Sequence, residues 1–163
     1  MLGVDPGLRV TGWGLVGADG GDLRAVQSGV IAPRVNLPTE QRLHEIYREL
    51  CKVIARWRPA ELAVEDPFVA QNARSAFAIG EARAVALLAA AQAGLSVRPY
   101  APAEVKLVVA GYGRSGKAQV QELVRIQLGL VEAPEPVDAA DALAVALCHH
   151  LRRRAELRLE LAT

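Results

Sequence analysis

The sequence predicts an α/β domain in which a mixed five-stranded sheet has helices on both faces. Short apolar stretches separated by Gly-rich turns open the chain, apolar residues then recur at helical spacing, and apolar stretches alternate with helical patterns after that. A run of adjacent strands followed by strand–helix alternation gives antiparallel and parallel neighbours in one sheet. Because 163 residues suffice for one well-buried core but not for two, we expect a single domain.

The first elements are expected to be three strands in an antiparallel meander. Their apolar stretches lie at residues 2–4, 12–16 and 26–31. In residues 38–56 the apolar side chains recur every three or four positions, which predicts a helix that ends before Pro59. This helix crosses over to a fourth strand at residues 62–65.

The second half of the chain is predicted to be mainly helical. Asn72 suits the N-cap of a long Ala-rich helix that ends at Gly94, and the fifth strand follows at residues 96–100. Further helices are expected at residues 102–110, 118–128 and 136–154. We therefore expect one domain over residues 1–154 and a C-terminal tail over residues 155–163.

Composition excludes several classes of protein. The hydrophobic content of 52% and mean hydropathy of +0.17 are too high for a disordered chain, yet no apolar run approaches the roughly 20 residues that a bilayer span requires. No signal-peptide pattern follows Met1, so we expect a cytoplasmic protein without a membrane partner. Cys51 and Cys148 have no C-x-x-C partner and are expected to be ordinary buried thiols. A net charge of +1 does not by itself indicate a nucleic-acid binder, so the motifs must decide.

Acidic residues stand where α/β proteins usually build their active sites. Asp5 ends the first strand, Glu65 ends the fourth, and Asp138 and Asp141 begin the last helix. Ligands of open α/β sheets bind beyond the carboxyl ends of the strands, so Asp5 and Glu65 share a crevice if their strands are neighbours. The i, i+3 spacing places Asp138 and Asp141 on one face of the helix, where the positive end of its dipole favours their ionised form.

Four carboxylates brought together repel one another, and hard cations between them relieve the repulsion. Oxygen ligands without a nearby His or Cys indicate Mg²⁺ or Mn²⁺ rather than zinc. Each acid also has an ordinary explanation when taken alone: Asp5 belongs to a common Asp-Pro-Gly turn, Glu65 suits a solvated strand end, and Asp138 suits a helix cap. Their combination in one small domain favours a metal site.

Several segments resemble the RuvC family of Holliday-junction resolvases, in register over almost the whole chain. They are Leu-Gly-Val-Asp-Pro-Gly-Leu-Arg-Val-Thr-Gly-Trp-Gly at residues 2–14, Ala-Val-Glu at residues 63–65 followed by Phe68, Asn72-Ala73, Gly80 with Ala82-Arg83, and Asp-Ala-Ala-Asp-Ala-Leu-Ala at residues 138–144. The resemblance implies an RNase H-like fold, a homodimer and paired, metal-dependent nicking of four-way DNA junctions. It also implies RuvA and RuvB, which form the branch-migration complex, as partners.

The same resemblance implies roles for individual residues. The family's catalytic and metal-binding acids, with two Mg²⁺ or Mn²⁺ ions per active site, fall on Asp5, Glu65, Asp138 and Asp141. Phe68 would stack on an unpaired base at the crossover, although a buried core position is its equal alternative. The basic residues implied in DNA contacts are Lys106 and Lys117 near the acids and Arg9, Arg74, Arg83 and Arg114 at the rim. Asp66-Pro67 departs from the family, which has a polar amide and an apolar residue there.

Other patterns suggest alternatives to a nuclease. Residues 111–117 read G-x-x-x-x-G-K, nearly a phosphate-binding P-loop, but Ala118 stands where a metal-binding Ser or Thr is required. The preceding residues also suit the last turn of a helix, with Gly111 as its stop. Asp5-x-Gly7 resembles the phosphate loop of sugar kinases, for which the chain is too short. The alternative is therefore a non-catalytic RNase H-like or nucleotide-binding module, which a calorimetric test of ATP binding would reveal.

Two histidines near the end of the chain are not expected in the site. His149 and His150 lie at least eight residues beyond Asp141, about 12 Å along a helix. We expect them at a helix end or on the surface.

The helix over residues 73–93 is apolar on nearly every face. Its large apolar side chains are Phe77, Ile79, Val85, Leu87 and Leu88. One small domain cannot bury all of them against its own sheet, so a second copy packed across a two-fold axis is expected. The alternative is a helix enclosed in the core of one monomer.

Overall fold

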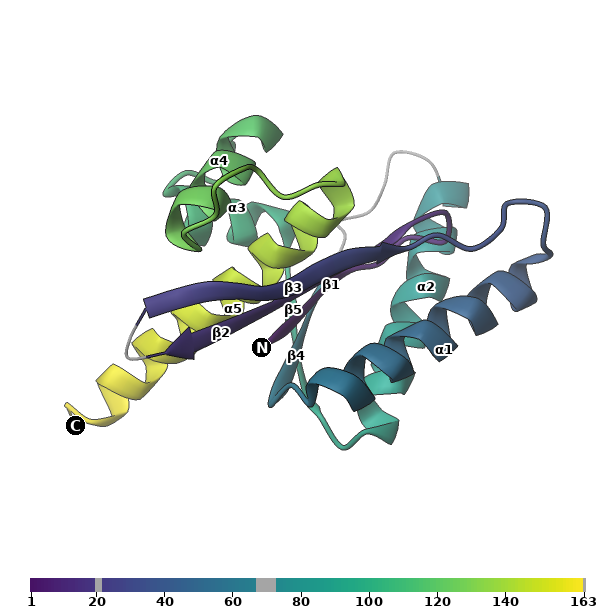
Figure 1. The fold of residues 1–163 in the computed structure, drawn as a ribbon, viewed down its shortest axis with the longest axis horizontal. Helices are drawn as coiled ribbons and strands as arrows, with labels where there is room; N and C mark the ends of the chain where they lie inside the picture. The colour runs from purple at the N-terminus through teal and green to yellow at the C-terminus, as the bar shows by residue number, and fades with distance from the viewer. Residues whose placement is uncertain (20–21, 67–72, 163) are drawn as a thin grey trace.

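Five strands form one mixed sheet in the computed structural model, which describes residues 1–19, 22–66 and 73–162. The strands are β1 (Leu2–Asp5), β2 (Thr11–Asp19), β3 (Asp22–Ile31), β4 (Glu61–Glu65) and β5 (Ser96–Tyr100). Their order is β3-β2-β1-β4-β5, with β1–β2 and β2–β3 antiparallel and β1–β4 and β4–β5 parallel (Figure 1). The predicted meander and mixed sheet are confirmed.

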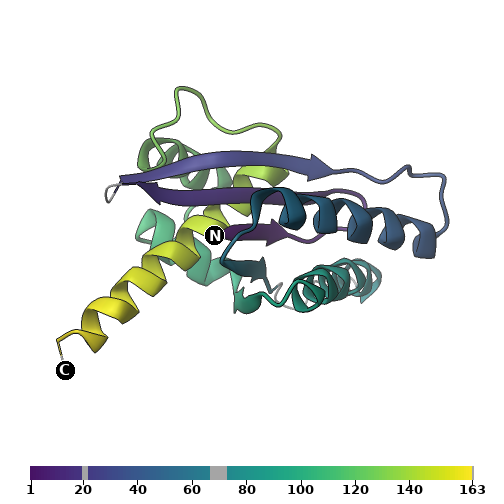
Figure 2. The same ribbon diagram turned by 60° about the horizontal axis from the view of Figure 1, so that its bottom comes forward.

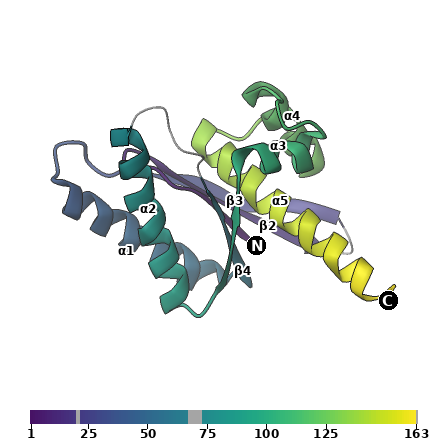
Figure 3. The same cartoon turned by 180° about the vertical axis from the view of Figure 1, so that it is seen from behind.

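Helices cover both faces of this sheet, as predicted for an RNase H-like fold. One face holds α1 (Thr39–Trp57) and α2 (Ala73–Gln92), and the other holds α3 (Pro102–Ala110), α4 (Lys117–Gln127) and α5 (Val137–Glu160) (Figures 1 and 2). Figure 3 shows from behind that α5 runs diagonally across the sheet and ends beyond it. Among the described helices, none is both long and apolar enough to cross a bilayer.

The end of the last helix is one point where the sequence prediction was wrong. Helix α5 continues to Glu160, so most of the residues predicted as a tail are helical. Arg153 pairs with Glu156 at i, i+3 and supports the extra turns. The Arg-rich stretch looked like a boundary because it is polar, but a helix end that extends past the sheet needs no apolar face.

Alternation along the central strands decides which side chains face which helices. The side chains on β1 and β4 that point toward α1 and α2 and pack against them are Leu2, Val4, Leu62 and Val64. Ala63 belongs instead to the core on the α5 side of the sheet. Because side chains alternate along a strand, Asp5 and Glu65 also lie on the α5 side, at the ends of their strands.

Helix α5 lies directly on β1 and β2 because glycines leave room for its backbone. A Cβ atom added to Gly12 would stand 1.9 Å from the carbonyl oxygen of Asp138, and one on Gly3 would stand 2.1 Å from that of Ala142. A Cβ atom on Gly14 would lie 2.7 Å from the side chain of Leu143. The first turns of α5 therefore approach the end of β1 more closely than any larger residue would allow.

Replacing Gly12 by Ala should destabilise the protein by about 2 kcal/mol or more, because the new methyl group overlaps the α5 backbone. The measurement is urea unfolding without added metal. Gly80→Ala is the matched control, since a Cβ atom there has open space and sits within α2. It should be neutral or stabilising by up to about 1 kcal/mol. Equal effects of the two variants would show that close α5 packing is not what Gly12 provides.

Candidate active site

The acids at the ends of β1 and β4 meet as the sequence predicts. These strands pair in parallel with Val4 opposite Val64, so Asp5 and Glu65 end neighbouring strands at the same edge. Asp5, Glu65 and Asp141 line one cavity of about 190 Å³. The N-terminal part of α5 supplies Asp141 and, one turn earlier, Asp138, which is half-buried and does not line that cavity.

Burial and the repulsion of nearby acids hold back ionisation of Asp5 and Glu65. The pKa of Asp5 rises from 3.8 to about 7, first because the carboxyl group is desolvated and then because Glu65, Asp141 and Asp138 are negative. The pKa of Glu65 is also raised, by burial and then by Asp141, while nearby Lys117 and Lys106 oppose the shift. Asp5 therefore interacts electrostatically with the three other acids, and Glu65 also interacts with Asp141.

A lysine already neutralises part of this charge. Lys117, the first residue of α4, donates from Nζ to Oδ2 of Asp141 at 2.9 Å. The bond raises the pKa of Lys117, which Asp5 and Asp138 raise further. Lys106 of α3 lines the same cavity. The two lysines thus place positive charge beside the carboxylates, where an anionic substrate would also be held.

The donor set fits a hard divalent cation. Within residues 1–19, 22–66 and 73–162, no three His, Cys, Asp or Glu side chains converge tightly enough to hold an ion as they stand. The groups that face one another are nevertheless carboxylates, and a cation between them would relieve their repulsion. Carboxylate oxygens are the ligands that Mg²⁺ and Mn²⁺ prefer. The Lys117 side chain is 71% exposed, so a cation can displace it from Asp141 at small cost.

The other basic residues named from the sequence lie at separate places. Arg9 and Arg74 line a groove of about 640 Å³ between the loop after β1 and the starts of α1 and α2. Arg83 pairs through Nε with Oδ1 of Asp66 at 3.1 Å, so the acid that departs from the family pattern has a cationic partner. Arg114 is exposed between α3 and α4. Phe68, Pro67 and Asn72 lie outside the described residues.

Two structural features near the site and along α5 were missed by reasoning from the sequence. Arg42 of α1 donates from Nη2 to the carbonyl oxygen of Leu8 at 2.7 Å and so ties down the loop after Asp5. The expectation for His149 was wrong, because its side chain is fully buried between α5 and the sheet. Distance along the helix correctly separates it from the acids, but α5 extends over the sheet at that point. His150 is half-buried.

The P-loop alternative does not survive the structure. Residues 102–110 form α3 rather than a strand, and Gly111, with φ of 74°, ends that helix as predicted. A P-loop requires a strand before the glycine-rich segment. Residues 111–117 therefore form a connection between two helices.

Comparison with known proteins points in one direction. A family model described as "Crossover junction endodeoxyribonuclease RuvC" matches residues 1–149. A protein of that name from Dehalococcoides mccartyi is 50% identical over 153 residues, 94% of this chain and 93% of its own. One from Thermotoga maritima is 47% identical over 155 residues, 95% of this chain and 92% of its own.

Solved structures give the same result. The structure of T. thermophilus RuvC in complex with Holliday junction substrate is similar with a TM-score of 0.90 and 36% identity, over 95% of this chain and 94% of that one. The yeast mitochondrial resolvase Ydc2, at 14% identity and a TM-score of 0.65, shares the fold over 96% of this chain and 81% of its own.

Asp5→Asn should stabilise the metal-free protein at pH 8 by on the order of 2 kcal/mol. Between about pH 4 and pH 7, native Asp5 binds a proton that the unfolded chain has lost, so native stability falls as pH rises through that window. The Asp5→Asn variant has no carboxyl group to titrate at this position, so its stability does not fall for this reason. Chemical unfolding from pH 4 to pH 8 should show the two proteins diverging with pH; curves that stay parallel would contradict the raised pKa.

Proposed function

The chain belongs to the RuvC family of crossover junction endodeoxyribonucleases, and on that premise we propose that it resolves four-way DNA junctions by paired, metal-dependent hydrolysis of phosphodiester bonds. The observation that supports this function best is the meeting of Asp5, Glu65 and Asp141 around one cavity beside two lysines. Such a cavity offers cation ligands and phosphate-binding groups within one small space.

The proposed metal ligands are the four acids Asp5, Glu65, Asp138 and Asp141. Asp5 is electrostatically coupled to all three others, so we assign it the central place among the ligands. Two Mg²⁺ or Mn²⁺ ions held there would activate a water and stabilise the leaving oxygen. The protein's own contribution is a group of closely placed carboxylates, whose ionised form bound cations would stabilise.

The proposed DNA contacts follow from where the basic side chains lie. Lys106 and Lys117 border the acids and would hold the phosphate next to the bond that is cut. Arg9 and Arg74 line the groove between the loop after β1 and the starts of α1 and α2, and they would hold the backbone of a junction arm. Arg83 and Arg114 are proposed as weaker contacts at the rim. Phe68 remains the proposed stacking residue at the crossover.

A homodimer is proposed because α2 leaves large apolar side chains uncovered. Phe77 is 72% exposed and Leu88 is 59% exposed, whereas Val85 and Leu87 pack partly against the core below. A second copy related by a two-fold axis would cover the exposed pair and place two sites for paired cuts on a symmetric junction. RuvA and RuvB are the proposed partners of the dimer, and the cytoplasm is its proposed location.

Asp5→Asn and Glu65→Gln should each lower junction cleavage at least about 100-fold while leaving junction binding intact or slightly tighter. Each removes a proposed metal ligand and a negative charge that faces phosphate. Cleavage and gel-shift assays on a synthetic four-way junction, with and without Mg²⁺ or Mn²⁺, measure both effects. Glu49→Gln, at a partly exposed position of α1 outside the cavity, is the matched acid-to-amide control and should cut normally. Near-native cleavage by either site variant would mean that the acids are misassigned.

Leu88→Glu should convert the dimer to a monomer at micromolar concentration and replace paired nicks by single ones, because the added charge cannot be buried between two α2 helices. Sedimentation and the ratio of nicked to resolved junction are the readouts. Ile126→Glu, which adds the same charge at an exposed apolar site on α4, should remain dimeric. A native monomer that still makes paired cuts would rule the proposal out.

A further inference from the structure

The first turns of α5 pack closely on the strand glycines, and the rest of its buried surface is apolar. Between Asp141 and His149, large buried side chains (Leu143, Val145 and Leu147) alternate with buried alanines (Ala142, Ala144 and Ala146). Apolar attraction is not directional, whereas a hydrogen bond weakens steeply when its geometry changes, so polar contacts define the position of such a helix most sharply. Helix α5 presents Asp138 and Asp141 to the site, so a slide would change their distances from Asp5 and Glu65.

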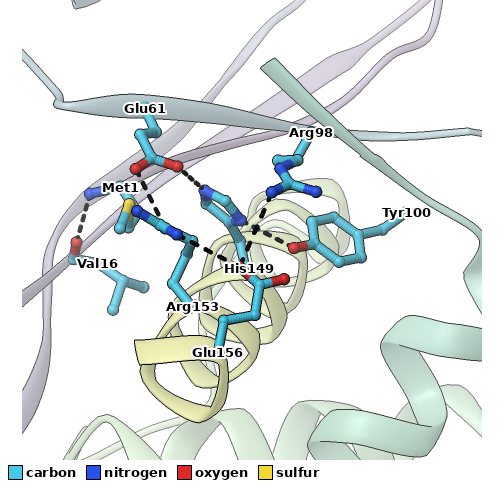
Figure 4. A network of polar contacts seen from close by, with 8 residues as sticks. All are labelled: Met1, Val16, Glu61, Arg98, Tyr100, His149, Arg153 and Glu156. Carbon is cyan, nitrogen blue, oxygen red and sulfur yellow. Dashed lines mark hydrogen bonds and ion pairs between the residues drawn. The ribbon is translucent and has the colours of Figure 1, made fainter. Parts of the chain in front are cut away.

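Hydrogen bonds join the far end of this segment of α5 to two strands of the sheet. The fully buried His149 is 2.8 Å from Glu61 Oε2 through Nε2, and its Nδ1 is 2.8 Å from the hydroxyl oxygen of Tyr100 (Figure 4). Neutral imidazole satisfies both contacts, with Nε2–H donating to the carboxylate and the tyrosine O–H donating to Nδ1. Burial lowers the pKa of His149, which agrees with a neutral ring.

Ion pairs extend the network on the same side. Arg153 lies 3.5 Å from the second oxygen of Glu61 and 3.3 Å from Glu156, and Glu156 lies 3.8 Å from Arg98 of β5 (Figure 4). These pairs are partly exposed and contribute less than the buried bonds of His149. Like the hydrogen bonds of His149, these ion pairs connect α5 to β4 and β5.

The span between the two ends of β4 is close to the span between the matching points on α5. Glu61 and Glu65 are the first and last residues of β4, four positions or about 13 Å apart along a strand. Asp141 and His149 are eight positions or about 12 Å apart along α5. At one end His149 bonds to Glu61; at the other, Asp141 lies across the cavity from Glu65.

We propose that His149 is a positioning residue, which through Glu61 and Tyr100 fixes where α5 lies along β4 and thereby sets the spacing of Asp138 and Asp141 from Asp5 and Glu65. The proposal rests on the metal-binding function proposed above. A buried imidazole must keep its hydrogen bonds, and its two partners stand on two different strands, so only one position of the helix satisfies both. Apolar packing and the strand glycines hold the first turns of α5 on β1 and β2, and His149 fixes the far end of the helix relative to β4 and β5.

The test compares variants that remove the connection with one that keeps it. Glu61→Ala removes the acceptor of His149, Glu61→Gln retains an acceptor oxygen, and His149→Ala removes the ring. Ile46→Val trims a fully buried side chain on the opposite face of the sheet and serves as the control for a loss of stability alone. Binding of Mn²⁺ to the full chain is measured by electron paramagnetic resonance at a temperature where circular dichroism shows every variant folded, and the Mn²⁺ dependence of junction cleavage is measured alongside.

Glu61→Ala and His149→Ala should bind Mn²⁺ at least about fivefold more weakly than the native chain, while Glu61→Gln and Ile46→Val bind it normally. Saturating Mn²⁺ should restore most of the maximal cleavage rate, because the ligands themselves are intact. If Glu61→Ala binds Mn²⁺ as the native chain does, or if Ile46→Val weakens binding equally, the positioning role is refuted. If His149→Ala does not fold, the contrast between Glu61→Ala and Glu61→Gln decides. A native chain that binds no Mn²⁺ would refute the metal site itself, a different result from any of these.

Discussion

The backbone of α5 rests on the backbones of β1 and β2, and the site depends on that contact. Gly3, Gly12 and Gly14 are the strand residues that allow it, since a Cβ atom on any of them would overlap the helix. Without this close approach, Asp138 and Asp141 would stand one side-chain layer farther from the end of β1. The parallel pairing of β1 with β4 adds Glu65 at the same edge. Three segments that are far apart in the chain thus bring acids to one place.

Bringing these acids together opposes folding in the absence of cations. The raised pKa of Asp5 reflects both the burial of its carboxyl group and the negative charges around it. Lys117 offsets part of the repulsion through Asp141, but its side chain is mostly exposed and easily displaced. The rest of the structure supplies the opposing stability, through apolar cores on both faces of the sheet and the buried bonds of His149. Local repulsion supported by a stable scaffold is typical of functional sites.

The sequence predicted those features that depend on local patterns. Asp5 and Glu65 were predicted to share a crevice if their strands were neighbours, and the parallel pairing of β1 with β4 meets that condition. The i, i+3 spacing predicted only that Asp138 and Asp141 share a face of the last helix. The features that it did not predict depend on contacts between distant segments. Whether position 149 faces solvent or the sheet depends on the path of α5 across β4, and neither the Arg42–Leu8 bond nor the Arg83–Asp66 pair has a local signature. His149 was expected at a helix end or on the surface, Arg83 was expected at the DNA-binding rim, and Arg42 was given no role. In the structure each of these side chains joins two separate elements.

The acids of β1, β4 and α5 are proposed to form one metal site. Anomalous X-ray scattering from a crystal soaked in MnCl₂ tests it most directly. We predict manganese peaks between Asp5, Glu65 and the start of α5, with the Lys117 ammonium group moved away from Asp141. Manganese peaks only elsewhere on the molecule, or no peak at these acids when other surface carboxylates bind the ion, would contradict the proposed metal site.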